Sequence, residues 1–200
     1  MIINHDKKTV FISVPKTGCT SIMVLLDPQS IHEKPEVYHM TIAEALVANQ
    51  TLADYHFIGM VRTPFDRCVS TYFDIIWDKS HGKWAENLAQ SQGFPHFVDM
   101  AIGDGSLEVI RHLWAQSRFF AASQQVKITV LKYEDYNRSA HLICEAFGKT
   151  SMGLGRWRDT ASKRRPFQEY LNEPTMKKIQ SIYAEDFKAF GYAIDPLATA

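Results

Sequence analysis

The chain has 200 residues, with 22 basic and 22 acidic side chains and therefore no formal net charge. This length corresponds to one domain with a single core, and 46% hydrophobic residues argue against a disordered, collagen-like or coiled-coil protein. The neutral total argues against a surface coated in cations for nucleic acid, although it allows a local basic pocket. We expect one domain over residues 1–200 and no nucleic-acid partner.

The cysteines and the hydropathy of the chain indicate its compartment. Cys19, Cys68 and Cys144 lie far apart and form no CxxC pair, which favours reducing conditions. No stretch approaches the roughly 20 apolar residues that span a bilayer. The apolar run after the charged residues 6–8 is shorter than the ~7–15 residues of a signal-peptide core. We therefore expect a cytoplasmic protein without a membrane span.

Short β-rich runs alternate along the chain with segments of helical periodicity. Thr41 and Glu44 have the spacing of a capping box, and Pro64 suits the first turn of a helix. In chain order, the predicted elements are a strand at 10–14, a helix from about 22, a helix at 41–48, a strand at 56–61, a helix at 64–77, a helix at 107–120, a strand at 126–131, a helix at 140–147 and a helix at 174–190. This alternation predicts an α/β fold whose central parallel sheet is flanked by helices and binds ligands at the carboxyl ends of its strands.

The first strand leads into a segment rich in donors for an anion. Lys16 supplies a full charge, and Gly18 allows a tight turn and close approach of the backbone. Thr17, Thr20 and Ser21 add hydroxyls, and the N–H groups at a helix start attract anions. We expect a phosphate-binding loop, the alternative being an ordinary connection with a solvated lysine. The loop is not a Walker A motif, because its lysine precedes the only glycine.

A second candidate phosphate site follows the strand at 56–61. Arg62 comes directly after that strand, and Ser70 lies about two turns into the next helix. A planar guanidinium suits a phosphate, so we expect both side chains to bind one. The alternative is a surface ion pair of Arg62 with Asp66 or Asp74.

These two segments resemble motifs of a known family. The loop reads VPKTGCTS at residues 14–21, and the second segment reads VRTPFDRCVSTY at residues 61–72. They are similar to the 5′-phosphosulfate loop and the 3′-phosphate motif of sulfotransferases that use 3′-phosphoadenosine 5′-phosphosulfate (PAPS). Similar segments at 131–135 and 182–192 extend the resemblance, which fits best the carbohydrate branch that includes heparan sulfate 2-O-sulfotransferase and its bacterial relatives.

The resemblance implies a single sulfotransferase domain of the small soluble bacterial type, with a P-loop-like three-layer fold. The chain departs from the family pattern at Cys19, where Gly or Thr is frequent, and at Thr63, where Asp or Asn is frequent. The chain is also short, so the segments that bind the acceptor must be small.

The resemblance also implies PAPS as donor, 3′-phosphoadenosine 5′-phosphate (PAP) as product, and no metal. Lys16 would neutralise the departing phosphate, and Arg62 with Ser70 would hold the 3′-phosphate. Ser162 and Lys163, in a basic stretch at residues 156–165, would close over the nucleotide. The backbone N–H groups that would cradle the 5′-phosphate are those of Thr17, Gly18, Cys19, Thr20 and Ser21.

A neutral alcohol needs a base before it can attack a sulfuryl group. His39 lies between the two donor motifs, where the similar branch has a catalytic histidine. Histidine side chains in general suit this role, because their pKa lies near neutrality. The other candidates are Glu33, His32 and His56.

Three functions remain open at this point. The first is a PAPS-dependent O-sulfotransferase that acts on a hydroxyl of a glycan or a secondary metabolite by in-line attack. The second is a small-molecule kinase with Mg²⁺ and ATP, for which Asp135 is the obvious carboxylate ligand. The third is a module that senses PAP without catalysis. The zero net charge argues mildly against a long polyanionic glycan as the acceptor.

Overall fold

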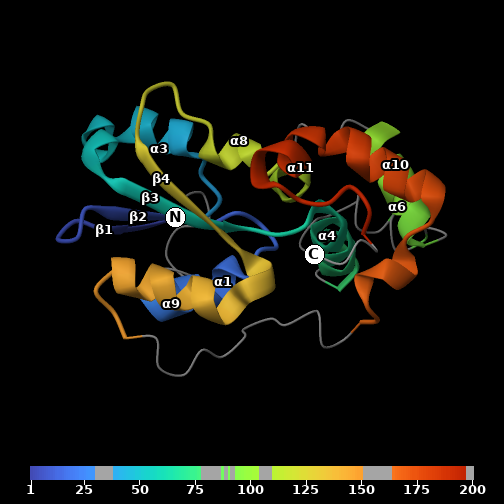
Figure 1. The fold of residues 1–200 in the computed structure, drawn as a ribbon, viewed down its shortest axis with the longest axis horizontal. Coiled ribbons are helices and arrows are strands. Elements are labelled where there is room, and N and C mark those ends of the chain that lie inside the picture. The colour runs from blue at the N-terminus through green and yellow to red at the C-terminus, as the bar shows by residue number, and fades with distance from the viewer. Residues whose placement is uncertain are drawn as a thin grey trace. The chain divides into compact units, whose positions relative to one another are not determined.

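The computed structural model describes residues 1–29, 38–77, 87, 90, 93–103, 110–150 and 164–196. They belong to two compact units. Figure 1 colours the ribbon by residue number, from blue at the N-terminus to red at the C-terminus. The first unit comprises Met1–Arg62 and Gln116–Arg158, and the second comprises Thr63–Ala115 and Asp159–Ala200.

The first unit is built on a mixed sheet with the strand order β1-β2-β3-β4. Its strands are β1 (Ile2–Asn4), β2 (Thr9–Ile12), β3 (His56–Val61) and β4 (Lys127–Lys132). The last three strands are parallel, with Phe11 opposite Ile58 and Ile58 opposite Thr129, which confirms the predicted parallel sheet. The edge strand β1 lies antiparallel to β2 and was not predicted, because three residues beside a charged turn carry too little pattern.

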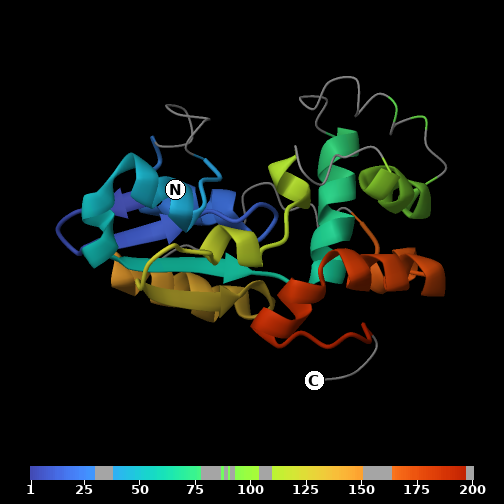
Figure 2. The same ribbon diagram turned by 90° about the horizontal axis from the view of Figure 1, so that it is seen from above.

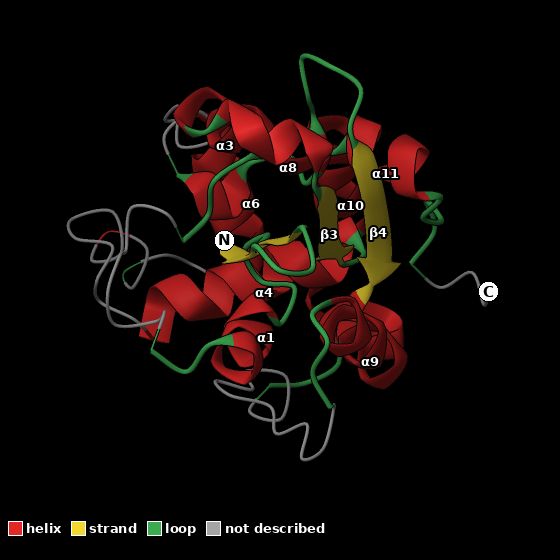
Figure 3. Ribbon diagram, turned by 90° about the vertical axis from the view of Figure 1, so that its left-hand side faces the viewer, coloured by secondary structure: helices red, strands yellow, loops and turns green. Residues whose placement is uncertain are grey.

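Helices cover both faces of this sheet, as Figures 1 and 3 show. On one face, α1 (Cys19–Leu26) and α9 (Tyr136–Ala146) share a buried apolar cluster with Phe11, Ile58 and Met60. The opposite face is covered by α3 (Ile42–Ala48), the 3₁₀ turn η2 (Gln50–Asp54) and α8 (Ser117–Phe120). Because side chains alternate along a strand, both faces bury apolar residues, and the three-layer α/β fold is confirmed.

The predicted capping box of α3 is confirmed atom by atom. The Thr41 hydroxyl accepts from the Glu44 N–H at 3.1 Å, and the Glu44 carboxylate accepts from the Thr41 N–H at 2.8 Å. This cap fixes where α3 begins, directly after the segment that carries His39. Helix α9 begins four residues earlier than predicted, because the turn η5 (Tyr133–Asp135) leads directly into it.

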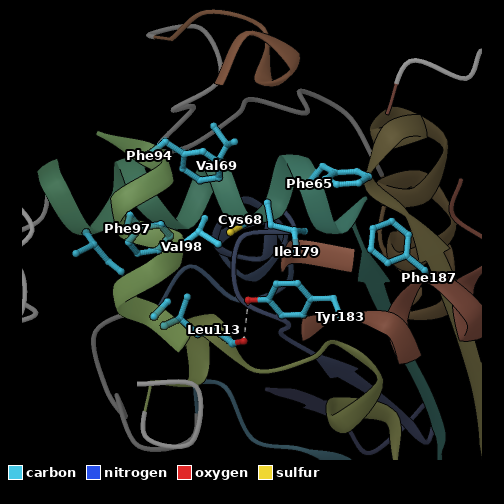
Figure 4. Packing of buried hydrophobic residues seen from close by; sticks show 12 residues of the cluster. Phe65, Cys68, Val69, Phe94, Phe97, Val98, Leu113, Ile179, Tyr183 and Phe187 are labelled. Atoms are coloured by element: carbon cyan, nitrogen blue, oxygen red, sulfur yellow. Dashed lines mark hydrogen bonds between the residues drawn. The ribbon is translucent and has the colours of Figure 1, made fainter. Parts of the chain in front are cut away.

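The second unit is helical and has its own core. Figures 1 and 2 show α6 (Phe94–Gly103) and α10 (Glu173–Ile182) beside α4 (Pro64–Trp77), whose bounds match the prediction. The remaining elements are α11 (Ala184–Phe190) and the 3₁₀ turns η4 (Arg111–Leu113) and η7 (Phe167–Tyr170). Aromatic and aliphatic side chains from four of these helices meet in the cluster of Figure 4, where the Tyr183 hydroxyl donates to the Leu113 carbonyl at 2.9 Å.

Two predicted helices are wrong in extent. The single helix at 174–190 is divided into α10 and α11 by Tyr183, whose φ of −111° and ψ of 27° are not helical. The helix at 107–120 is replaced, from residue 110 onward, by the short turn η4, an extended Trp114 and the short α8. In that segment the His112 and Trp114 carbonyls accept from the buried Arg67 guanidinium at 3.1 and 2.8 Å, so side-chain contacts take the place of helical hydrogen bonds.

Candidate functional site

The loop between β2 and α1 turns through two left-handed residues. Lys16 has φ +67° and Gly18 has φ +75°, and α1 begins at the next residue. The buried Thr17 hydroxyl donates to the Val14 carbonyl at 2.9 Å, so it stabilises the loop from within. The result is a tight connection that ends at a helix N-terminus, where backbone N–H groups and the helix dipole favour an anion.

Gly18 is required by its surroundings as well as by its backbone. A Cβ at this position would lie 2.9 Å from Tyr136 Cε2 and 3.1 Å from Tyr133 Cε2. Tyr133 begins the turn η5 after β4, and Tyr136 is the first residue of α9. The rings thus press on the loop where it enters α1, and only glycine satisfies both the space and the positive φ.

The two predicted phosphate-binding cations are brought to the same loop. The Arg62 side chain, in a residue only 4% exposed, donates from Nη1 to the Lys16 carbonyl at 3.1 Å. Its guanidinium carbon lies 4.1 Å from the centre of the Tyr133 ring, within the range of a cation–π interaction. The Arg62 guanidinium, directly after β3, therefore lies against the loop that follows β2, as expected at the carboxyl edge of a parallel sheet.

The backbone of Arg62 is held by a residue that the sequence analysis missed. The Gln116 side chain accepts from the Arg62 N–H at 2.8 Å and donates to the Arg62 carbonyl at 2.8 Å. Gln116 is fully buried. No motif surrounds it, so only its position in space reveals the contact. The sequence marks Tyr133 only as part of a segment that resembles the family, and nothing in it indicates the contacts of the ring with Arg62 and Gly18.

His39 is joined to the same edge of the sheet through Ser13, the residue after β2. Its Nδ1 lies 2.7 Å from the Ser13 carbonyl oxygen, which can only accept, so Nδ1 carries the hydrogen. The Ser13 hydroxyl donates to the Tyr38 carbonyl, which ties the preceding residue to the same strand end. In the neutral imidazole, the lone pair is therefore on Nε2, the atom that can take a proton.

Cys19, at the first position of α1, is a neutral group. Burial raises the pKa of its thiol above the ordinary value, and the charge of Lys16 opposes this shift only in part. A thiol that stays protonated adds no negative charge to the loop. The positive potential of Lys16 and Arg62 is thus not cancelled by the side chain that departs from the family pattern.

The remaining candidates are not part of this arrangement. His56 begins β3, so it lies at the opposite end of the strand from Arg62, about 20 Å away at 3.3 Å per residue. Its Nε2 is hydrogen-bonded to the Thr129 hydroxyl at 2.8 Å. Ser70 is buried on α4 in the second unit, so its sharing a phosphate with Arg62 stays a prediction. The predictions for Ser162, Lys163, Glu33 and His32 concern residues outside the described ranges.

The cations and the histidine of this arrangement suit anion binding and proton transfer. Within the described ranges, no three His, Cys, Asp or Glu side chains are grouped so that they could hold a metal ion. Asp135, the candidate ligand for Mg²⁺ in a kinase, is exposed in η5. Among the helices of the described part of the chain, none is long and apolar enough to cross a membrane.

Comparison with protein families agrees with this combination of fold and site. Residues 1–193 match the model of the sulfotransferase family. The chain therefore belongs to the sulfotransferase family and is a transferase of sulfuryl groups. A search of the curated proteins finds no significant match. The family match does not single out the heparan sulfate 2-O branch.

Proposed function

We propose that this protein is a PAPS-dependent O-sulfotransferase in which His39 is the general base. The observation that carries the proposal is a pair of hydrogen bonds that join Arg62 and His39 to the same loop at the carboxyl edge of the sheet. The Lys16 carbonyl is bonded to the Arg62 side chain, and the Ser13 carbonyl, three residues earlier, is bonded to the His39 ring. Lys16, the Arg62 side chain and the candidate base thus lie at one loop, residues 13–18, which joins β2 to α1.

The residues present fit a donor that carries several phosphate and sulfate charges. The left-handed Lys16 and Gly18 shape a loop that ends at the N-terminus of α1, where backbone N–H groups favour an anion. Lys16 with the backbone of residues 17–21 would hold the 5′-phosphosulfate, and Arg62 would hold the 3′-phosphate. When bound, the donor supplies an activated sulfuryl group on a phosphate leaving group.

Two side chains would then take part in the reaction: His39 would remove a proton, and Lys16 would stabilise a negative charge. His39 Nε2 would accept the proton of the acceptor hydroxyl, while the Ser13 carbonyl keeps Nδ1 protonated and the ring in place. The Lys16 ammonium would stabilise the negative charge that grows on the departing phosphate oxygen. The acceptor would be a hydroxyl of a glycan or of a small metabolite in the cytoplasm.

Ligand binding tests the donor. A thermal-shift measurement with PAP, compared with ATP and Mg²⁺, should show stabilisation by PAP, because only a ligand that binds the native state raises Tm. Lys16→Ala should weaken PAP binding. Lys8→Ala is the matched control, since Lys8 also has a positive φ but lies in the exposed turn between β1 and β2. Stabilisation by ATP and Mg²⁺ alone would favour the kinase instead.

Turnover tests the base. His39→Gln should lower the rate of sulfuryl transfer from PAPS about a hundredfold to ten-thousandfold, because general-base assistance is lost. PAP affinity should be unchanged in this variant. His56→Gln, at the far end of β3, should keep full activity. Unchanged turnover in His39→Gln would assign the base to another residue, and PAP binding without transfer to any hydroxyl in a broad acceptor panel would indicate a sensing module.

A further inference from the structure

The backbone of Arg62 lies just beyond the end of the sheet. The last residue pair of the β3–β4 ladder is Val61 opposite Lys132, so Arg62 is the first residue of β3's course without a ladder partner. A buried backbone N–H or carbonyl that lacks a partner is costly. Arg62 is 4% exposed, so its two backbone groups need partners from the protein.

Gln116 supplies both of them. A primary amide has an acceptor oxygen and N–H donors, as a peptide unit does. Both bonds to Arg62 are 2.8 Å long, and the Gln116 side chain is fully buried. The side chain therefore continues the sheet by one residue in place of a neighbouring strand.

The guanidinium of the same arginine is held at two further points. Nη1 donates to the Lys16 carbonyl, and the flat face of the group lies over the Tyr133 ring. A long side chain whose backbone and head group are both fixed before a ligand arrives loses little freedom on binding. The two bonds from Gln116 fix the backbone from which this side chain leaves the strand.

We propose that Gln116 is a positioning residue for recognition of the donor's 3′-phosphate, acting through Arg62. The proposal rests on the proposed function, since it assigns Arg62 to that phosphate. Gln116 itself touches the Arg62 backbone and has no role as a ligand-binding group. Its loss should weaken the ligand that carries a 3′-phosphate and spare the one that lacks it.

Two ligands and two variants provide the test. PAP and adenosine 5′-phosphate differ only by the 3′-phosphate. We expect Gln116→Leu to raise the Kd of PAP about tenfold, as for a lost pair of hydrogen bonds, and to change that of adenosine 5′-phosphate less than twofold. Gln116→Glu keeps the acceptor for the Arg62 N–H and loses the donor to its carbonyl, so it should fall between the wild type and Gln116→Leu. Titration calorimetry measures all of these constants.

A control separates positioning from loss of stability. Thr9→Val removes the buried hydroxyl that donates to the Lys7 and Ala146 carbonyls at the amino end of β2, far from Arg62. It should lower the free energy of unfolding and leave the Kd of PAP unchanged. If Gln116→Leu does not fold, Gln116→Glu decides the question against the same control.

A double-mutant cycle identifies the path of the effect. In an Arg62→Ala background, Gln116→Leu should not weaken PAP further. A full additional loss there, equal weakening of both ligands, or an unchanged Kd of PAP in the single variants would overturn the positioning role. If the wild-type protein binds no PAP, the proposed function falls and this inference with it, whereas PAP binding with an additive cycle overturns the inference alone.

Discussion

Two left-handed residues give the candidate loop its shape, and they do so at different cost. Glycine adopts a positive φ without strain, whereas a residue with a Cβ loses roughly 1–2 kcal/mol there. Lys16 has φ +67°, so a charged side chain is retained where glycine would be more stable. Strain of this kind is typical of functional sites, and this supports the role proposed for Lys16.

Lys16→Gly should therefore stabilise the protein while it removes the function. We expect the free energy of unfolding in urea to rise by about 0.5–1 kcal/mol, and PAP-dependent activity to be lost. Lys8→Gly, at φ +46°, should give a similar gain in stability with full activity. Equal activity in the two variants would contradict the role of the Lys16 ammonium.

Gly18 tests the contact between the loop and its two tyrosines. Gly18→Ala should lower the free energy of unfolding by about 2–4 kcal/mol, because the Cβ adds a steric clash to the backbone strain. Gly191→Ala has the same backbone cost, at φ +62°, but no atom within 4 Å of the new Cβ, so about 1 kcal/mol is expected there. Chemical denaturation of both variants measures the difference. Equal losses would mean that Tyr133 and Tyr136 yield to the new group.

At the level of elements, capping and strand ends determine where the site residues lie. The capping box fixes the start of α3 at Ile42, three residues after His39. The Ser13 carbonyl holds the His39 ring from the other side. The candidate base is therefore held between the end of β2 and the start of α3, and both elements contribute to its orientation.

The cap of α3 should contribute to stability and to catalysis together. Thr41→Ala removes the hydroxyl that accepts from Glu44 and should cost about 1 kcal/mol in the free energy of unfolding. A drop in kcat with an unchanged KM for the donor should accompany it, since His39 is positioned from this end. Val47→Ala, on the same helix at 89% exposure, should change neither quantity. A loss of stability alone would show that the cap does not position His39.

Over the whole molecule, the described residues have two separate cores. Phe11, Ile58 and Met60 belong to the cluster of the first unit, and Phe65 and Tyr183 to that of the second. Among the largest fully buried side chains of the described residues is Arg67, in the second unit, whose guanidinium donates to the His112 and Trp114 carbonyls. Its guanidinium carbon also lies 5.8 Å from the centre of the Tyr183 ring.

Arg67→Met should weaken the second unit selectively. Two partly buried carbonyls lose a charged donor that is itself fully buried, and we expect a loss of about 3–5 kcal/mol in the free energy of unfolding of that unit. Native-state hydrogen exchange should show faster opening across α4 and α10, with β2 and β3 less affected. The same acceleration in all four elements would show that the two cores unfold as one cooperative unit.

Much of the local structure could be predicted from neighbouring residues. The bounds of β3 and α4, the capping box at Thr41 and the loop around Gly18 all follow from patterns within a few positions of the chain. The match to the sulfotransferase family over residues 1–193 agrees with the two motifs that begin at Val14 and Val61. Such signals are readable because strand alternation, caps and turns are set by short-range backbone preferences.

Contacts between distant residues decided the rest. The carbonyls of His112 and Trp114 accept from Arg67, 45 and 47 positions away, which replaces the predicted helix. Gln116 reaches Arg62 across 54 positions, and His39 rather than His56 lies at the carboxyl edge because the strands run parallel. No local pattern encodes these partners. These partners form because buried polar groups must be hydrogen-bonded in the folded chain. The sequence therefore shows which residue types make up the site, and only the tertiary structure shows how they are arranged.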